Sequence, residues 1–179
     1  ICYFRKEVFP NSRANMTQSD EMSTNVPKKI SKRGYAGRSA EQLMQERRQR
    51  LMDTALELFG TVGYVPTTVE KICSHAKVTT RHFYEHFKDR EALLMAIFDT
   101  ILQETRQKVL AEIITSDLPL EQRFVGAVNA FLTSHLDDPR RAKITTQEIL
   151  GVSQRVEAHR NVLITEFALL IEGYLTDRK

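Results

Sequence analysis

The 179-residue sequence predicts an all-α fold. Apolar side chains recur at helical spacing through most of the chain after residue 38, and no segment alternates apolar and polar residues as a half-buried strand does. Apolar residues make up 41% of the chain, enough to form a buried core. We therefore expect a three-helix headpiece over residues 39–88 and a helical body over residues 89–179.

Residues 1–38 show no sustained period and hold 8 Lys/Arg against 3 Asp/Glu, which predicts a disordered basic tail. Two interpretations of its basic end stay open: an arm that follows DNA phosphates or enters a minor groove, or a solubilising linker. Because position 1 is Ile, the sequence could be a fragment, or the true start could be Met16 or Met22.

The first helix is expected to begin at Ser39, which can form a capping box with Gln42. Its apolar stripe is Leu51, Ala55, Leu58 and Phe59, and Gly60 and Gly63 are expected to end it.

A short second helix should follow, capped by Thr67 or Thr68, with Glu70 near its start. Its inward side chains are expected to be Val69, Ile72, Cys73 and Ala76. Cys73 is more simply a small buried apolar residue than a reactive thiol.

A turn over residues 76–78 leads to a third helix that Thr79 caps. Phe83 and Phe87 should be buried, which leaves Thr80, Arg81, His82 and Tyr84 on the outer face. Helix, tight turn and exposed polar helix form a helix-turn-helix, which presents its second helix to the DNA major groove.

The body is expected to contain four helices. The fourth helix spans about 90–115 with Asp89 as its cap, the fifth about 120–136, the sixth begins at Pro139 and ends near Leu150, and the last spans about 153–176. On the fifth helix, the residues expected to face inward are Phe124, Val125, Val128, Phe131 and Leu132; on the last, they are Val156, Val162, Leu163, Phe167, Leu170, Ile171 and Leu175.

The outer face of the third helix carries the chemistry that DNA recognition needs. Thr79 and Thr80 lie at the helix N-terminus, where backbone N–H groups attract a phosphate, and Arg81 can donate two hydrogen bonds to a guanine edge. His82 and Tyr84 can reach bases or phosphates, whereas His86 and Lys88 are placed for the DNA backbone.

The stretch resembles the tetracycline-repressor (TetR) family of one-component regulators. The resemblance rests on ALELFGTVGY (55–64), TTVEKI (67–72) and HAKVTTRHFYEHFKDREALL (75–94), and more weakly on residues 138–142 and 148–153. It implies an all-α homodimer whose body binds a small molecule and thereby releases operator DNA. Carried over by position, Thr68 and Thr79 contact phosphates, Thr80, Arg81 and His82 face bases, and Tyr84, His86 and Lys88 hold phosphates.

The sequence departs from the family pattern at two places. Lys77 stands in the turn where the family usually has Gly; a positive φ there costs roughly 1–2 kcal/mol, and the lysine adds a charge near the DNA. The chain stops at Lys179, where members normally have one or two more helices that build the dimer interface. Two interpretations stay open: a C-terminally truncated chain or a reduced body.

Other functional classes find little support. Two cysteines without a CxxC motif fit a reducing cytoplasm. The sequence has no run of about 18 apolar residues, so no transmembrane helix is expected, and its first residues do not have the pattern of a secretory signal. His82 and His86 have a metal-capable spacing but lack a third ligand, so no metal and no cofactor is expected. No nucleophile–base pair, phosphate loop or carboxylate dyad has the spacing of an enzyme.

The partners we expect are a double-stranded DNA operator, a second copy of the chain and a small-molecule effector, for which the apolar body suggests a lipophilic character. Phe124, Phe131, Ile144 and Phe167 could line the effector cavity, or could simply form core. Two alternatives stay open: a helical interaction module with vestigial DNA binding, and an activator that uses the same DNA contacts.

Overall fold

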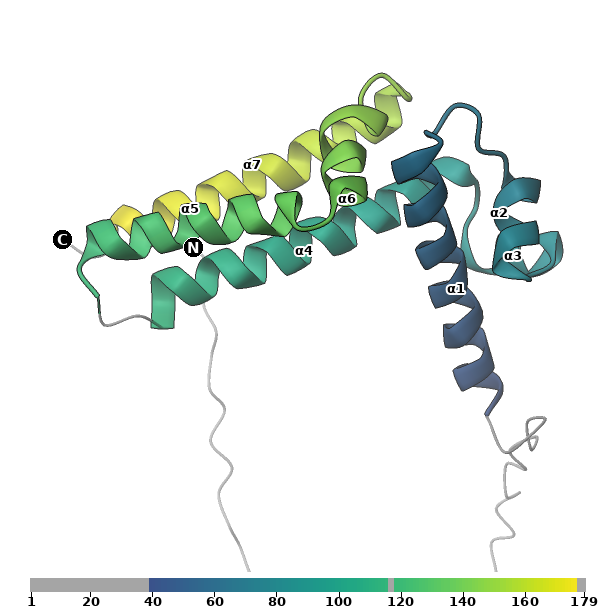
Figure 1. The fold of residues 1–179 in the computed structure, drawn as a ribbon, viewed down its shortest axis with the longest axis horizontal. Coiled ribbons are helices and arrows are strands. Elements are labelled where there is room, and N and C mark those ends of the chain that lie inside the picture. The colour runs from purple at the N-terminus through teal and green to yellow at the C-terminus, as the bar shows by residue number, and fades with distance from the viewer. Residues whose placement is uncertain (1–38, 116–117, 177–179) are drawn as a thin grey trace, which may run out of the picture. The chain divides into compact units, whose positions relative to one another are not determined.

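The computed structural model describes residues 39–115 and 118–176. These residues form helices joined by turns and contain no strand, so the all-α prediction is confirmed (Figure 1). All of them belong to one compact unit. The predicted basic tail, residues 1–38, lies outside the described residues.

Three helices precede the body: α1 (Ala40–Thr61), α2 (Val69–Ala76) and α3 (Thr80–His86). The long α4 (Arg90–Thr115) follows and leads to α5 (Leu120–Leu136). Then come the short α6 (Pro139–Lys143), the π-helix η2 (Ile144–Glu148) and α7 (Gln154–Thr176).

Capping side chains determine most of these boundaries. Ser39 and Gln42 form the predicted capping box, in which each side chain accepts from the other residue's backbone N–H, at 3.1 and 2.8 Å. Thr68 rather than Thr67 caps α2, and Thr79 caps α3. Asp89 accepts from the Ala92 N–H at 2.7 Å, so α4 begins where the sequence predicts.

The main hydrophobic core joins the first three helices to the start of α4 and to parts of the body. Its fully buried aromatic side chains are Phe59 and Phe83, which lie with Leu93, Leu94 and other apolar residues. Ile144, Ile149 and Val156 extend this core into η2 and α7. Because the core is continuous here, the domain boundary at residues 88 and 89 stays a prediction.

The burial expected for α5 is wrong. Its large apolar side chains are exposed, Val125 by 67%, and the buried residues are Ala127 and Ser134. Helices α4 and α5 lie side by side (Figure 1), and the residues that α5 itself buries are small. The exposed larger side chains are Phe124, Val125, Val128, Phe131 and Leu132. Val162 on α7 is also exposed, contrary to expectation.

The two glycines at the end of α1 have different roles. Gly63 adopts a φ of 106° and allows the chain to turn, as expected. Gly60 does not end the helix, because α1 continues to Thr61. A Cβ at residue 60 would lie 2.4 Å from Arg140 Cβ and 2.8 Å from Arg140 Cα. Gly60 thus allows α1 and α6 to come so close that their backbones are in contact.

We expect Gly60→Ala to lower the free energy of unfolding by about 1–2 kcal/mol, because the new methyl group overlaps the Arg140 backbone. This cost should exceed the helix-propensity gain of up to about 1 kcal/mol. Gly173→Ala is the control, since an added Cβ there meets nothing within 4 Å. Urea unfolding followed by circular dichroism measures both variants, and a stabilised Gly60→Ala protein would contradict the close contact.

Candidate nucleic-acid interface

A left-handed residue makes the turn between α2 and α3. Lys77 has φ 53° and ψ 44°, and it is the one non-glycine residue with positive φ in the described part of the chain. The Val78 N–H donates to the Cys73 carbonyl at 3.0 Å and closes the turn. The sequence identified this position as a departure from the family, and the backbone has the conformation that glycine adopts at least cost.

The orientation of α3 follows from its buried aromatic residue. Phe83 is fully buried, and its ring centroid lies 5.3 Å from that of Tyr84 and 5.8 Å from that of Phe87. Thr80, Arg81 and Tyr84 consequently face solvent. Arg81 is 88% exposed and its Nε lies 3.6 Å from Glu85 Oε1, a loose surface ion pair that a ligand can displace at little cost.

Seven of the nine predicted DNA-contacting residues are exposed, and two histidines are half-buried. The exposed ones are Thr68, Lys77, Thr79, Thr80, Arg81, Tyr84 and Lys88; the half-buried ones are His82 and His86. His82 Nδ1 lies 3.0 Å from Thr79 Oγ1, so its ring is held beside the start of α3.

His86 differs most from the expectation of a phosphate contact. Its Nε2 is buried, with no hydrogen-bond partner among the described residues. Burial lowers the pKa of His86; the Glu85 carboxylate opposes this effect, and Arg48, Arg47 and His82 add to it. The ring is therefore neutral at pH 7 and contributes no permanent positive charge.

Two arginines of α1 act on this histidine through their charge, and they were not among the predicted DNA-contacting residues. Arg47 and Arg48 act electrostatically on His86, and the Arg48 guanidinium lies 5.2 Å from the centre of the Phe87 ring. The spacing within α1 could not reveal this, because the juxtaposition depends on how α1 packs against α3.

A second arginine contact fixes the turn that leads into α2. Arg90 Nη1 donates to the backbone carbonyls of Tyr64, at 3.2 Å, and Val65, at 3.3 Å, as well as to that of Thr67. Its guanidinium also lies 4.1 Å from the centre of the Tyr64 ring. The start of α4 thereby fixes the α1–α2 turn.

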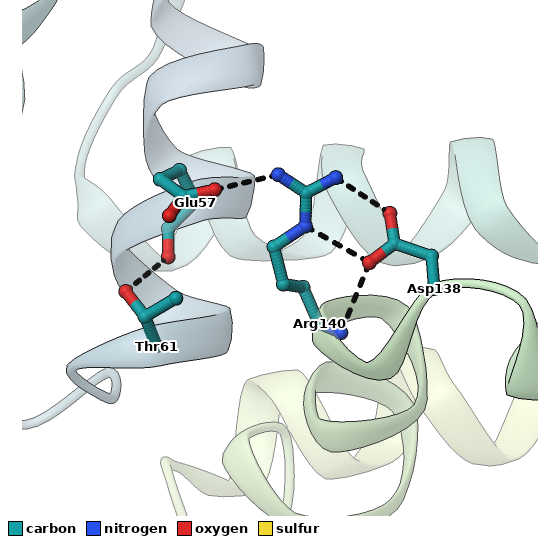
Figure 2. Close-up of polar contacts among 4 residues, drawn as sticks. All are labelled: Glu57, Thr61, Asp138 and Arg140. Atoms are coloured by element: carbon teal, nitrogen blue, oxygen red, sulfur yellow. Dashed lines mark hydrogen bonds and ion pairs between the residues drawn. The ribbon is translucent and has the colours of Figure 1, made fainter.

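The end of α1 contacts α6 through a branched ion pair. Figure 2 shows Arg140 between Glu57, whose Oε2 lies 2.5 Å from Nη1, and Asp138, which accepts from Nε at 2.9 Å and from Nη2 at 2.8 Å. Hydrogen bonding to Arg140 holds the pKa of Asp138 below its usual value. This contact and the Gly60 approach join the helix-turn-helix region to the body.

Three of the four predicted ligand-lining residues lie together. Phe124, Phe131 and Phe167 border an apolar groove of about 320 Å³ between α4, α5 and α7. The other lining residues are also apolar: Val109, Ile113, Ala127, Val128, Ile164, Ala168 and Ile171. Ile144 was predicted to join them but is fully buried in the main core, because η2 packs against the helix-turn-helix region.

In the described residues, no group of three or more His, Cys, Asp or Glu side chains could hold a metal ion. None of the described helices combines the length and hydropathy that crossing a membrane requires.

Comparison with known proteins matches residues 51–97 to the family described as "Bacterial regulatory proteins, tetR family". The chain belongs to the TetR family. The match covers the C-terminal half of α1, the helix-turn-helix and the start of α4. The resemblance seen in the sequence rests on the same region.

Curated relatives and solved structures extend the similarity into the body. The TetR chain is 30% identical over 124 residues to the HTH-type transcriptional regulator HbdR of Aromatoleum sp. (strain CIB), covering 69% of the chain and 52% of the relative. It is 25% identical over 150 residues to the uncharacterized regulator YerO of Bacillus subtilis (strain 168), covering 75% and 51%. It therefore spans about half the length of these relatives. FadR from Bacillus subtilis, solved in complex with stearoyl-CoA, shares the fold with a TM-score of 0.65 at 19% identity, over 72% of this chain and 69% of that one.

We expect Lys77→Gly to be more stable than Lys77→Ala by about 1 kcal/mol, because only glycine adopts φ 53° without steric cost. Both variants remove the charge, so the comparison isolates the backbone effect. Thermal unfolding of the two variants and the parent chain measures the difference. Equal stability of the glycine and alanine variants would mean that residue 77 is not left-handed in solution.

Proposed function

We propose that this TetR-family chain is a transcriptional regulator that binds a near-palindromic DNA operator as a homodimer and is released from it by a small hydrophobic effector. The proposal rests above all on the solvent-exposed face of α3, where Thr80, Arg81 and Tyr84 stand opposite the buried Phe83. HbdR and YerO, which the chain resembles, are named as HTH-type transcriptional regulators. Such a regulator acts in the bacterial cytoplasm.

The side chains of the α2–turn–α3 region divide into two proposed roles. Arg81 has the donor geometry to read a guanine edge, with Thr80 and His82 beside it on α3. The cations and hydroxyls around Arg81 bind phosphates of the DNA backbone on either side of the bases that are read. These residues are Thr68, Lys77, Thr79, Tyr84 and Lys88. We give His86 a lesser part than the sequence predicted, because its ring is half-buried and neutral.

The proposed dimer brings two α3 helices to successive major grooves, so the half-sites lie about 34–36 Å apart, or a multiple of this distance. The large apolar side chains exposed along α5 and α7 support this proposal, because a second copy of the chain could cover them. These same side chains also fit the alternative of a helical interaction module, in which DNA binding is lost.

The effector we propose carries a hydrocarbon chain. The groove between α4, α5 and α7 is lined by apolar side chains alone, which suits an alkyl chain and offers no partner to a buried charge. The structural neighbour FadR from Bacillus subtilis was solved with stearoyl-CoA, a ligand with such a chain.

We expect Arg81→Ala to relax base preference at one operator position by about 1–3 kcal/mol, because it removes the donor pair that reads the base. Lys88→Ala should weaken binding to all sequences alike and lower the slope of log K against log salt by about one. Selection from a random duplex library gives the operator, and fluorescence anisotropy at two salt concentrations measures both variants. If the parent chain selects no sequence, the proposal of a sequence-specific regulator fails in favour of the helical interaction module. If Arg81→Ala keeps its base preference, Arg81 does not read a base.

We expect Ala168→Phe to abolish release of the selected operator by stearoyl-CoA, because the new ring fills the groove that Ala168 lines. Operator binding itself should be unchanged, since residue 168 lies on α7 in the body. Leu169→Phe is the control, as Leu169 is exposed and does not line the groove. Release titrations of the two variants test the site; equal release from both would place the effector elsewhere.

A further inference from the structure

The backbone of Tyr64 is held from two sides by side chains outside the helix-turn-helix. Its N–H donates to Glu148 Oε2 at 2.7 Å, and its carbonyl accepts from Arg90 Nη1 at 3.2 Å. Glu148 is the last residue of η2, and Arg90 is the first of α4. Because Tyr64 lies in the turn between α1 and α2, these two residues set the direction in which the chain enters α2.

The π-helical form of η2 determines where Glu148 points. Successive residues of an α-helix are about 100° apart, so residues five positions apart diverge by about 140°. Hydrogen bonding from i to i+5 brings such residues to nearly the same face. The Ile149 N–H donates to the Ile144 carbonyl at 3.2 Å, which is a bond of this kind.

Two pairs of residues exploit this geometry. Ile144 and Ile149, five positions apart, are both fully buried in the main core. Lys143 and Glu148, also five apart, form an ion pair at 3.4 Å between Nζ and Oε1. Lys143 Nζ donates to the Thr61 carbonyl at 3.2 Å, while Glu148 accepts from Tyr64. An α-helical turn would direct one member of each pair away from α1.

Local features favour the π form and the close approach of its carboxylate. The Thr145 and Thr146 hydroxyls donate to the carbonyls of Arg141 and Ala142, at 3.0 and 2.7 Å, where the α-helical bonding pattern ends. Gly63 lies opposite Glu148, and a Cβ there would come within 3.3 Å of Oε2. The glycine thus leaves space for the carboxylate at the Tyr64 amide.

We infer that η2 couples the body to the helix-turn-helix. In this coupling Glu148 is a positioning residue that holds the α1–α2 turn through the Tyr64 amide. Conversion of η2 to an α-helical turn withdraws Glu148 or Lys143 from the end of α1 and frees the start of α2. η2 thus lies where a change in the helical form of the body would reach the end of α1 and the turn into α2. This inference rests on the proposed function for its meaning, whereas the contact itself is testable without DNA.

The direct test is amide hydrogen exchange in the full chain. In Glu148→Ala, exchange at Tyr64 and through α2 should accelerate about tenfold or more, while amides in α4 and α7 keep their protection. Glu148→Gln should retain near-normal protection, because its side-chain carbonyl still accepts from the Tyr64 N–H. Gln147→Ala is the control, since Gln147 is an exposed neighbour in the same π-helix.

Operator affinity gives the second readout, on the duplex selected by the parent chain. Glu148→Ala should weaken binding about tenfold, and Glu148→Gln should restore it. Unchanged exchange at Tyr64 in Glu148→Ala, or equal acceleration in α4 and α7, would overturn the positioning role. If the parent chain selects no operator, the proposed function fails, and the exchange data alone decide whether Glu148 holds the turn.

Discussion

Burial of Phe83 is the constraint on which the rest of the interface depends. A helix as short as α3 has little stability of its own, so its orientation comes from this one ring in the core beside Phe59, Leu93 and Leu94. Once the ring is buried, the Thr80–Arg81–Tyr84 face can only point outward. The turn at Lys77 and the Arg90 contacts then fix the angle at which α2 and α3 meet the rest of the chain.

The helix order and most helix ends could be predicted from the sequence because their determinants are local. Ser39, Thr79 and Asp89 each cap a helix through a backbone N–H only a few residues away. The exposed face of α3 was also predictable, since Phe83 and Phe87 are one helical turn apart and identify the opposite side. Gly60 was misread as a helix end because its partner, Arg140, is distant in the sequence.

Burial in the body could not be predicted in the same way. The sequence of α5 has many large apolar residues, and a helix usually buries these, yet the residues that α5 buries are Ala127 and Ser134. Which side of such a helix meets its neighbour depends on how closely the two backbones approach, and periodicity does not encode that distance. The same limit explains Ile144, whose apolar character fits a ligand cavity and a core equally well.

The contact between Gly60 and Arg140 has a consequence for how the family can vary. The atom nearest Gly60 is Arg140 Cβ, which every residue except glycine possesses, so the spacing of α1 and α6 is nearly independent of the side chain at position 140. Charge at this junction can therefore change during evolution while the helix spacing is preserved. A headpiece joined to a body whose α6 approaches as closely as this one would be most stable with glycine at position 60, and would tolerate many residues opposite it.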